Sequence, residues 1–190
     1  MLRRGIRISK SGRVAAPMKR LILMRHAKTE PWHESVDDHG RALVERGFID
    51  AAAVGRELTS RGWVPDSALI STARRARETW RVVSADWGEV PAIPDEAMYL
   101  AAPQTIDAVL SANSPAGTLI VVGHNPGLHE YACMLDRRGP PGNPYAHDRL
   151  FEKFPTGCVA LFEAGEEVVY HSSAFHLVDI IRARDLEEDD

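Results

Sequence analysis

Two histidines stand at positions where an imidazole could take part in chemistry. His26 follows Arg25 directly after the apolar run at residues 21–24, and His124 comes shortly after the apolar run at residues 118–122. A neutral imidazole nitrogen is a competent nucleophile toward phosphorus, and the hydrogen bond made by the other ring nitrogen decides which one attacks. A second, protonated histidine can donate to phosphoryl oxygens where charge is redistributed in the transition state. Two such histidines could serve phosphoryl transfer if other residues hold a phosphate between them.

Arginines follow the same kind of apolar run. Arg25 comes directly after the first run, and residues 71–77 (Ser-Thr-Ala-Arg-Arg-Ala-Arg) follow a shorter run at residues 67–70. Guanidinium groups collected at one place repel one another unless an anion lies among them, and their planar forks match phosphate or carboxylate oxygens. The helix that Pro126 opens adds free backbone N–H groups and the positive end of a helix dipole. These residues predict a phosphate pocket that works without a metal ion, because arginines and a cationic histidine supply the charge.

Short apolar runs alternate with helical patterns from residue 21 onward, and this alternation indicates how the residues are positioned. Strands are predicted at the three runs named above and, as a short edge strand, around Ile93. Helices are predicted along two apolar stripes and after two prolines: Leu43 to Leu58, Ala73 to Trp87, Pro103 and Pro126. Because ligands of open parallel sheets bind outside the carboxyl ends of the strands, three strand ends would present the histidines and arginines to one rim.

The last third of the chain is predicted to be less regular. Residues 136–156 are rich in Pro and Gly and predict a long loop, and whether it closes over a ligand as a lid stays open. Residues 158–162 and 168–170 lie on either side of Gly165 and predict a hairpin. The alternation as a whole predicts one α/β domain of three layers, with a mostly parallel central sheet and helices on both faces.

The composition is that of an ordinary globular protein and disfavours several classes. The 190 residues, 44% hydrophobic and 26% charged, are enough for one domain with a buried core. A net charge of −4 disfavours nucleic acid as a partner. No apolar run reaches the roughly 20 residues of a membrane span, so we expect no membrane partner and a cytoplasmic location. The two cysteines and the scattered histidines lack metal-ligand spacing, which predicts no metal site, no disulfide and no cofactor.

The N-terminus is predicted to be a basic arm. Residues 1–20 contain seven lysines and arginines and no acidic residue. Such a composition cannot bury an apolar face, so we expect residues 1–18 to be disordered and residues 19–185 to form the folded domain. Met18 lies directly before the first predicted strand and is an alternative start of the chain. The role of the arm stays open.

Three motifs resemble those of the histidine phosphatase superfamily, whose fold is phosphoglycerate mutase-like. LILMRHAKTE is similar to its apolar strand followed by Arg-His-Gly, with Ala27 in place of the glycine, a small change that should still let the backbone approach phosphate. STARRARETW and VVGHNPG are similar to its second arginine and second histidine motifs, and the resemblance covers roughly residues 19–175 in the same order. RHAKTEPW, DDHGRALVERG and the compact length without a large inserted cap most resemble the small SixA-type phosphohistidine phosphatases.

The resemblance implies roles for individual residues. His26 would be the phosphoryl acceptor, and His124 would be the second histidine of the site. Three arginines would hold the phosphate oxygens: Arg25, Arg41 and Arg75. Asn125 would either line the pocket or only cap the following helix.

The general acid is left open by the resemblance. Larger members of the superfamily that cleave phosphate esters use a carboxylate to protonate a poor leaving group. Glu96, with Asp95 beside it, is the candidate in this sequence, and a solvated loop carboxylate is an equal alternative. Without an acid the enzyme should favour good leaving groups, and phosphohistidine departs readily as an imidazole once it is protonated.

These observations predict a metal-independent phosphatase that transfers a phosphoryl group to His26 and then to water. The predicted partner is a phosphorylated substrate, namely a phosphohistidine-bearing protein. One alternative is a small-molecule phosphomonoesterase acting on sugar phosphates or similar esters. Another is a non-catalytic scaffold that binds phosphate. The physiological substrate and the oligomeric state are not predicted.

Overall fold

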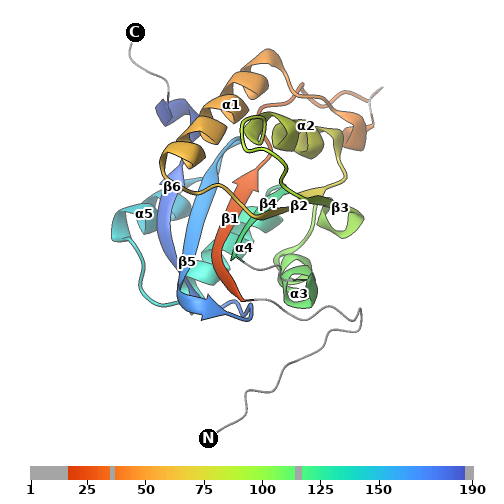
Figure 1. Cartoon of the computed structure of the whole chain (residues 1–190). Helices are drawn as coiled ribbons and strands as arrows, with labels where there is room; N and C mark the ends of the chain where they lie inside the picture. Colours follow the sequence, from red (N-terminus) through yellow and green to blue (C-terminus); the bar gives the residue numbers. More distant parts are fainter. Residues whose placement is uncertain (1–16, 35–36, 114–116, 187–190) are drawn as a thin grey trace, which may run out of the picture.

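The polar strand ends singled out above belong to one mixed sheet (Figure 1). The computed structural model describes residues 17–34, 37–113 and 117–186. Within them, the sheet has six strands: β1 (Met18–Arg25), β2 (Ser67–Ser71), β3 (Ala92–Asp95), β4 (Gly117–Gly123), β5 (Val159–Val168) and β6 (Phe175–Ile181). Their order across the sheet is β3-β2-β4-β1-β5-β6. Strands β3, β2, β4 and β1 pair in parallel, and β5 pairs antiparallel with both β1 and β6.

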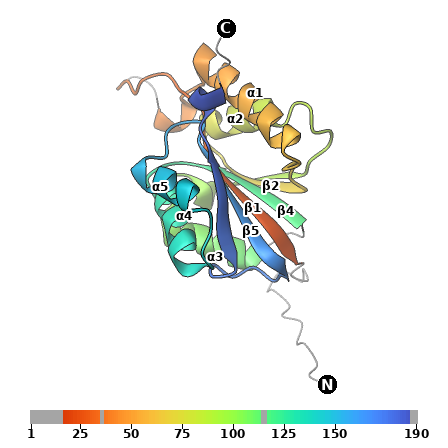
Figure 2. The same cartoon turned by 90° about the vertical axis from the view of Figure 1, so that its left-hand side faces the viewer.

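Helices cover both faces of this sheet and complete the three layers (Figure 2). The helices are α1 (Glu45–Ser60), α2 (Arg74–Val83), α3 (Pro103–Asn113), α4 (Gly127–Arg138) and α5 (Pro144–Glu152). Buried residues of α1 and α2 pack in one hydrophobic cluster with the sheet, and buried residues of α3, α4 and α5 pack in a second cluster on the opposite face. Three short 3-10 helices complete the elements: η1 (Asp38–Gly40), η2 (Glu96–Met98) and η3 (Ala183–Leu186).

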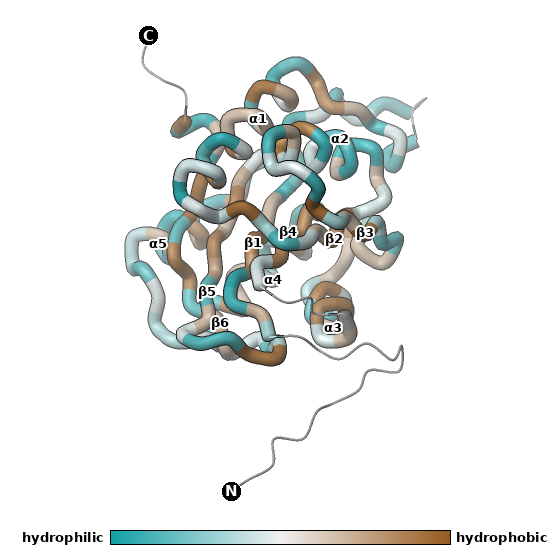
Figure 3. Tube along the Cα trace, in the orientation of Figure 1, coloured by the Kyte–Doolittle hydropathy of each residue, from teal (hydrophilic) through white to brown (hydrophobic). Residues whose placement is uncertain are grey.

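Hydropathy follows these layers. Figure 3 shows hydrophobic segments along β1 in the middle of the fold and hydrophilic segments along α2 at the surface. The residues of β1 from Leu21 to Met24 are all fully buried, as are Ile120 to Val122 of β4. A strand covered on both faces carries a continuous apolar run, which is why these two strands could be predicted from sequence. The predicted α/β class, the three layers and the mostly parallel sheet are confirmed.

The prediction of a hairpin around Gly165 is wrong. Strand β5 spans Val159–Val168, and its register against β1 shifts between Glu163 and Val168. The hairpin is formed instead with β6, where Ala164 pairs with Phe175. A Cβ added at Gly165 would have open space around it, so this glycine is tolerated in the strand and does not mark a turn. The prediction of a turn relied on glycine alone.

The prediction of a long loop at 136–156 is also wrong. Helix α4 continues to Arg138, and α5 occupies most of the remainder, with Ala146 and Leu150 fully buried in the core. The side chain of Asn143 accepts hydrogen bonds at the N-terminus of α5, and Pro144 occupies its first turn. This pair is a helix start signal, because a proline in the first turn loses no helical hydrogen bond. Most of this stretch is therefore helix packed against the core rather than one long loop.

The first strand begins three residues before the predicted apolar run at 21–24. Met18 begins β1 and is fully buried, although the basic arm was predicted to include it. The prediction of disorder for the arm falls almost wholly on residues 1–16, which lie outside the described residues. No helix among the described residues is long and apolar enough to cross a membrane.

Candidate active site

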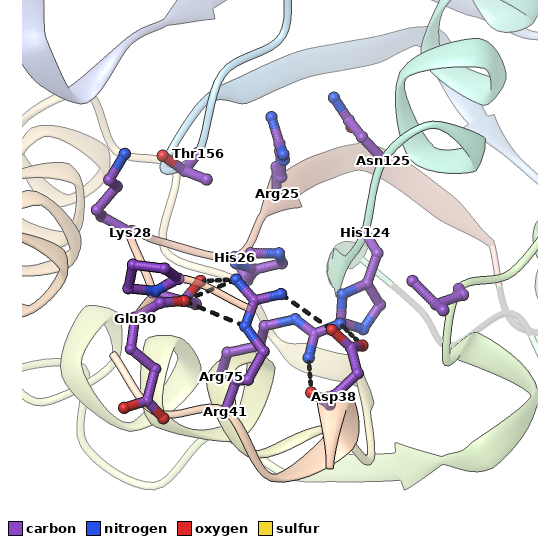
Figure 4. Close-up of a pocket in the computed structure, with 13 residues that line it drawn as sticks. Arg25, His26, Lys28, Glu30, Asp38, Arg41, Arg75, His124, Asn125 and Thr156 are labelled. Atoms are coloured by element: carbon purple, nitrogen blue, oxygen red, sulfur yellow. Dashed lines mark hydrogen bonds and ion pairs between the residues drawn. The ribbon is translucent and has the colours of Figure 1, made fainter. Parts of the chain in front are cut away.

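Six of the seven predicted site residues line one cavity of about 530 Å³ at the carboxyl ends of β1 and β4 (Figure 4). They are Arg25, His26, Arg41, Arg75, His124 and Asn125. Polar side chains make up nearly all of the remaining lining: Lys28, Thr29, Glu30, Asp38 and Thr156. Only Pro31 and Leu100 of the lining residues are apolar. The cavity is therefore suited to a charged ligand.

The parallel pairing of β1 with β4 brings the two histidines together. Arg25 lies opposite Gly123 in the register, and the backbone N–H of His26 donates to the Gly123 carbonyl at 3.0 Å. The next residue of each strand is a histidine. Their ring centroids are 5.2 Å apart, with the planes tilted by 55°. Two imidazoles at this distance can both reach one tetrahedral anion.

The tautomer of His26 follows from its hydrogen bond. Its Nδ1 lies 2.8 Å from the carbonyl oxygen of Ala27, which can only accept, so Nδ1 carries the proton and Nε2 keeps its lone pair. The pKa of His26 is lowered to about 4. Burial is the largest cause and the charge of Arg75 acts in the same direction, whereas the hydrogen bond to the Ala27 carbonyl raises the pKa. The imidazole is therefore neutral near pH 7, which is the form that a nucleophile requires.

Thr79 fixes the loop that carries His26. Its Oγ1 accepts a hydrogen bond from the Ala27 N–H at 3.0 Å and donates to the Arg75 carbonyl at 2.7 Å. Thr79 is fully buried, so both groups depend on this hydroxyl. One side chain thus connects the loop after β1 to the helix that carries Arg75.

Gly47 of α1 allows a second close approach to the same loop. A Cβ at this position would lie 2.1 Å from the carbonyl oxygen of Lys28. The absence of a side chain therefore lets α1 pack directly on the backbone that follows His26.

His124 is neutral as well, before any anion binds. Its Nε2 lies 2.7 Å from Oγ of Ser71, at the end of β2. Burial is the largest cause that lowers the pKa of His124, to about 3, followed by the charges of His26 and Arg75. Where Nε2 accepts from the serine hydroxyl, Nδ1 carries the proton and can donate to a ligand.

Arg41 and Arg75 converge on the carboxylate of Asp38 (Figure 4). Arg41 donates to Oδ1 at 2.9 Å, Arg75 donates to Oδ2 at 3.0 Å, and the Tyr99 hydroxyl donates to Oδ2 at 2.7 Å. Burial raises the pKa of Asp38, but the hydrogen bonds from Tyr99 and Arg41 and the charge of Arg75 outweigh this effect and lower it to about 2. Asp38 is therefore an anion that orients two guanidinium groups on separate elements.

The backbone carbonyl of Phe154 orients two other side chains that line the cavity. The carbonyl oxygen of Phe154 accepts from Nη1 of Arg25 at 3.0 Å and from Nδ2 of Asn125 at 2.8 Å. The N–H of Gly157 donates to the carbonyls of Arg25 and His26. The segment between α5 and β5, which sequence placed in a loop, thus supports the ends of β1 and β4.

Three buried nitrogens of residues that line the cavity have no partner in the protein. Nε of Arg25, Nε of Arg75 and Nδ1 of His124 are buried and have no hydrogen-bond partner within the described part of the chain. A buried donor without a partner costs free energy, which favours the binding of an acceptor beside these side chains. In the residues that the structure describes, no three His, Cys, Asp or Glu side chains are grouped so that they could hold a metal ion.

Glu96 is the predicted residue that the structure places elsewhere. It is exposed on η2 and does not line the cavity. Met98, two residues later, anchors this turn in the core, and Tyr99 is the side chain of this segment that reaches Asp38. Asp95 caps η2 by accepting from the Ala97 N–H. Neither carboxylate is therefore at hand to protonate a leaving group.

Sequence reasoning missed Asp38 and Tyr99. Asp38 stands three residues before Arg41 in the stretch DDHGRALVERG, which was singled out only for its arginine. An acid at that spacing on a short turn is a signal for an ion pair, so Asp38 could have been found. Tyr99 lies in a segment with no motif, and nothing in the sequence connects it with Asp38.

Comparison with known proteins agrees with this geometry. The model of the histidine phosphatase superfamily (branch 1) matches residues 21–99. An uncharacterised protein of Mycobacterium tuberculosis is 36% identical over 139 residues, which cover 73% of this chain and 85% of that protein. Fold, site and these matches show that the chain belongs to the histidine phosphatase superfamily.

Solved structures extend the similarity over most of the domain. A protein of Nakamurella multipartitia assigned as the phosphohistidine phosphatase SixA superposes with a TM-score of 0.74 and 25% identity, covering 86% of this chain and 95% of its own. A second protein with the same assignment, from Agrobacterium tumefaciens, gives a TM-score of 0.72 and 25% identity, covering 86% of this chain and 97% of its own. This similarity supports phosphatase activity.

Proposed function

We propose that this protein hydrolyses phosphohistidine on protein substrates through a phosphoryl group carried transiently by His26. The observation that carries the proposal is the hydrogen bond from Nδ1 of His26 to the Ala27 carbonyl. It leaves Nε2 unprotonated in a cavity that is lined by three arginines and a second histidine. The assignment of two similar structures as phosphohistidine phosphatases supports the choice of substrate.

In the first step Nε2 of His26 attacks phosphorus while the bond from phosphorus to the carrier nitrogen breaks. The free N–H groups of Arg25 and Arg75 and the Nδ1–H of His124 hold the equatorial oxygens, with Arg41 beside them. The carrier leaves as a neutral imidazole, provided that its other nitrogen was protonated before the bond broke. Burial of His124 in the ligand-free protein keeps it neutral, and the arrival of a dianion favours its protonated form.

In the second step a water molecule attacks the phosphorus bound to His26. The bond between phosphorus and Nε2 breaks, inorganic phosphate leaves, and His26 returns to its neutral form with the proton still on Nδ1. The same oxygen ligands serve both steps, so the chain's own residues account for positioning and charge stabilisation throughout. We propose that neither step requires a metal ion.

The carboxylates near the cavity favour a phosphoramidate over an alkyl ester. Asp38 has its pKa lowered to about 2 and is held by Arg41, Arg75 and Tyr99, so it carries no proton to donate at neutral pH. Glu96 is outside the cavity, and the carboxylate of Glu30, which lines it, accepts a hydrogen bond from the Ala42 N–H through Oε1. A poor alkoxide leaving group needs a proton at the moment of departure, whereas a protonated phosphohistidine does not.

A turnover screen tests the proposal. The protein would be mixed with a histidine-phosphorylated protein, a sugar phosphate and an aryl phosphate, with and without a chelator, and phosphate release would be measured. We expect the phosphohistidine protein to be the best substrate by kcat/KM, with no effect of the chelator. Turnover of the sugar phosphate without release from the phosphohistidine protein would instead support a small-molecule phosphomonoesterase. Activity that the chelator abolishes would contradict the metal-independent steps.

A further inference from the structure

Leu100 combines three properties that are unusual in one residue. It lines the cavity, its surface is 53% exposed, and its φ is +47°. Among the described residues it is the one non-glycine residue with a positive φ. Leucine avoids this conformation because its Cβ crowds the backbone, so the backbone at Leu100 is locally strained.

The residues around Leu100 hold the strained backbone in place. Met98 is buried in the core, and the Tyr99 hydroxyl is bound to Asp38. On the other side, the Ala101 carbonyl lies where a Cβ of Gly127 would be only 1.8 Å away, so this segment contacts the start of α4 directly. Leu100 is thus the side chain that a well-anchored segment turns outward at the cavity. Strain that persists because the surroundings enforce it is common at functional sites.

The lining of the cavity shows what Leu100 could contact. The phosphoryl group belongs among the arginines and histidines, which supply charge and N–H donors. Leu100 and Pro31 are the apolar lining residues, and neither can bind phosphate oxygens. The part of a substrate that needs an apolar contact is the group to which the phosphoryl is attached.

We propose that Leu100 forms a subsite for a flat, ring-shaped carrier bonded directly to the phosphoryl group, such as the imidazole of phosphohistidine. The choice of imidazole rests on the proposed function, whereas the ring subsite itself does not. The contact would raise kcat/KM for ring carriers over a phosphoryl donor that has no carrier. Leu100 is then a specificity-determining residue, and the phosphoryl chemistry belongs to the histidines and arginines.

Three substrates separate these claims: phosphoramidate, p-nitrophenyl phosphate and a phosphohistidine peptide. Phosphoramidate has the same P–N bond as phosphohistidine but no ring. The readout is the ratio of kcat/KM for each ring substrate to kcat/KM for phosphoramidate, so that changes common to all three cancel. We expect Leu100→Ala and Leu100→Gly to lower this ratio about three- to tenfold, because apolar contact area is lost. Leu100→Met, which keeps a long apolar side chain, should stay within about twofold of the unaltered protein.

Two controls test whether Leu100 is only structural. Ile93 on β3 is 50% exposed and does not line the cavity, so Ile93→Ala removes a comparable side chain and should leave the ratio unchanged. Melting temperature is the second control: Leu100→Gly should melt no lower than Leu100→Ala, because glycine relieves the positive φ that alanine retains. A fold that needs the leucine for packing would show the opposite order.

The outcomes are distinguishable. An unchanged ratio in Leu100→Ala, or the same decrease in Ile93→Ala, would overturn the subsite. If the unaltered protein cleaves phosphoramidate and the aryl phosphate but not the phosphohistidine peptide, the proposed physiological substrate is wrong. The aryl phosphate ratio would still decide whether Leu100 binds a ring. A decrease of both ring ratios in the two shortened variants supports the subsite and its imidazole ligand together.

Discussion

The carboxylate of Asp38 accepts a hydrogen bond from the guanidinium of Arg75, an arginine whose side chain is only 3% exposed. Arg75 lies on α2 and Asp38 on η1, so the ion pair joins two elements that are 37 residues apart in the sequence. Asp38 also binds Arg41 and the Tyr99 hydroxyl. One acidic residue therefore contacts two of the proposed phosphate ligands before a substrate arrives, and the Thr29 hydroxyl and the Glu30 carbonyl also hold Arg41.

Replacing Asp38 by asparagine should weaken both the fold and the site. The charge of Arg75 would stay buried without its counterion, which should cost on the order of 1–3 kcal/mol. The cost is smaller than for a fully buried pair, because the Asp38 side of this pair is partly exposed. Misplaced arginines should lower kcat/KM by about 10- to 100-fold. Thermal unfolding and steady-state kinetics measure the two effects.

Inorganic phosphate provides a further test of the Asp38 variant. An anion that replaces the missing carboxylate should raise the melting temperature of Asp38→Asn by more than that of the unaltered protein at the same concentration. Asp37→Asn is the matched control, because the Asp37 side chain makes no capping hydrogen bond. Equal behaviour of the two variants would contradict a role for Asp38 in orienting the arginines.

The Thr79→Val variant tests whether the hydroxyl of Thr79 contributes to stability and turnover beyond the shape of the side chain. Valine has nearly the same size but leaves the buried Ala27 N–H without an acceptor, which costs about 1–3 kcal/mol. For a chain of this length the melting temperature should fall by roughly 2–10 °C. Turnover should also fall, since the loop of His26 loses its connection to α2. Thr79→Ser keeps the hydroxyl and should retain most of the activity. A serine variant as impaired as the valine variant would show that the methyl group, rather than the hydrogen bonds, is what matters.

Both histidines should make the protein less stable in acid. Their pKa values in the folded protein are lowered to about 4 for His26 and about 3 for His124, against an ordinary value of 6.5. The unfolded chain therefore binds more protons below pH 6.5, and the free energy of unfolding falls as the pH decreases from there toward pH 4. Denaturant unfolding across this range measures the slope.

A variant carrying His26→Asn and His124→Asn tests the origin of that slope. Without the two buried imidazoles the loss of stability between pH 6.5 and pH 4 should be shallower than in the unaltered protein. The same slope in both proteins would mean that other groups are responsible. Inorganic phosphate should reduce the loss in the unaltered protein, because an anion favours the protonated form of the histidines beside it.

Much of the fold could be predicted because its central strands are buried on both faces. Continuous apolar runs such as residues 118–122 have few other interpretations, and strand ends in parallel sheets gather polar residues at one rim. The placement of His26, His124 and Arg75 at one cavity follows from that rule. Local signals and overall composition conflict in one part of the chain. Asn143 and Pro144 start a helix inside a stretch whose overall composition indicates a loop.

The remaining parts of the site depend on contacts that a sequence does not record. The Phe154 carbonyl orients Arg25 and Asn125, but any residue type could supply a backbone oxygen at that position. The contact between Tyr99 and Asp38 spans 61 residues and needs the whole sheet to be in place. The strain at Leu100 is a property of the backbone, since leucine itself gives no sign of a positive φ.

The central claim is that Nε2 of His26 carries the phosphoryl group during turnover. Its most direct test is rapid mixing with labelled phosphohistidine substrate, quenching in alkaline denaturant because phosphohistidine is labile in acid, and mapping of the label by proteolysis. The account predicts up to one label per chain, located on His26, and none in a His26→Ala variant that retains its fold by circular dichroism. Label on another residue, or turnover that persists in His26→Ala, would contradict it.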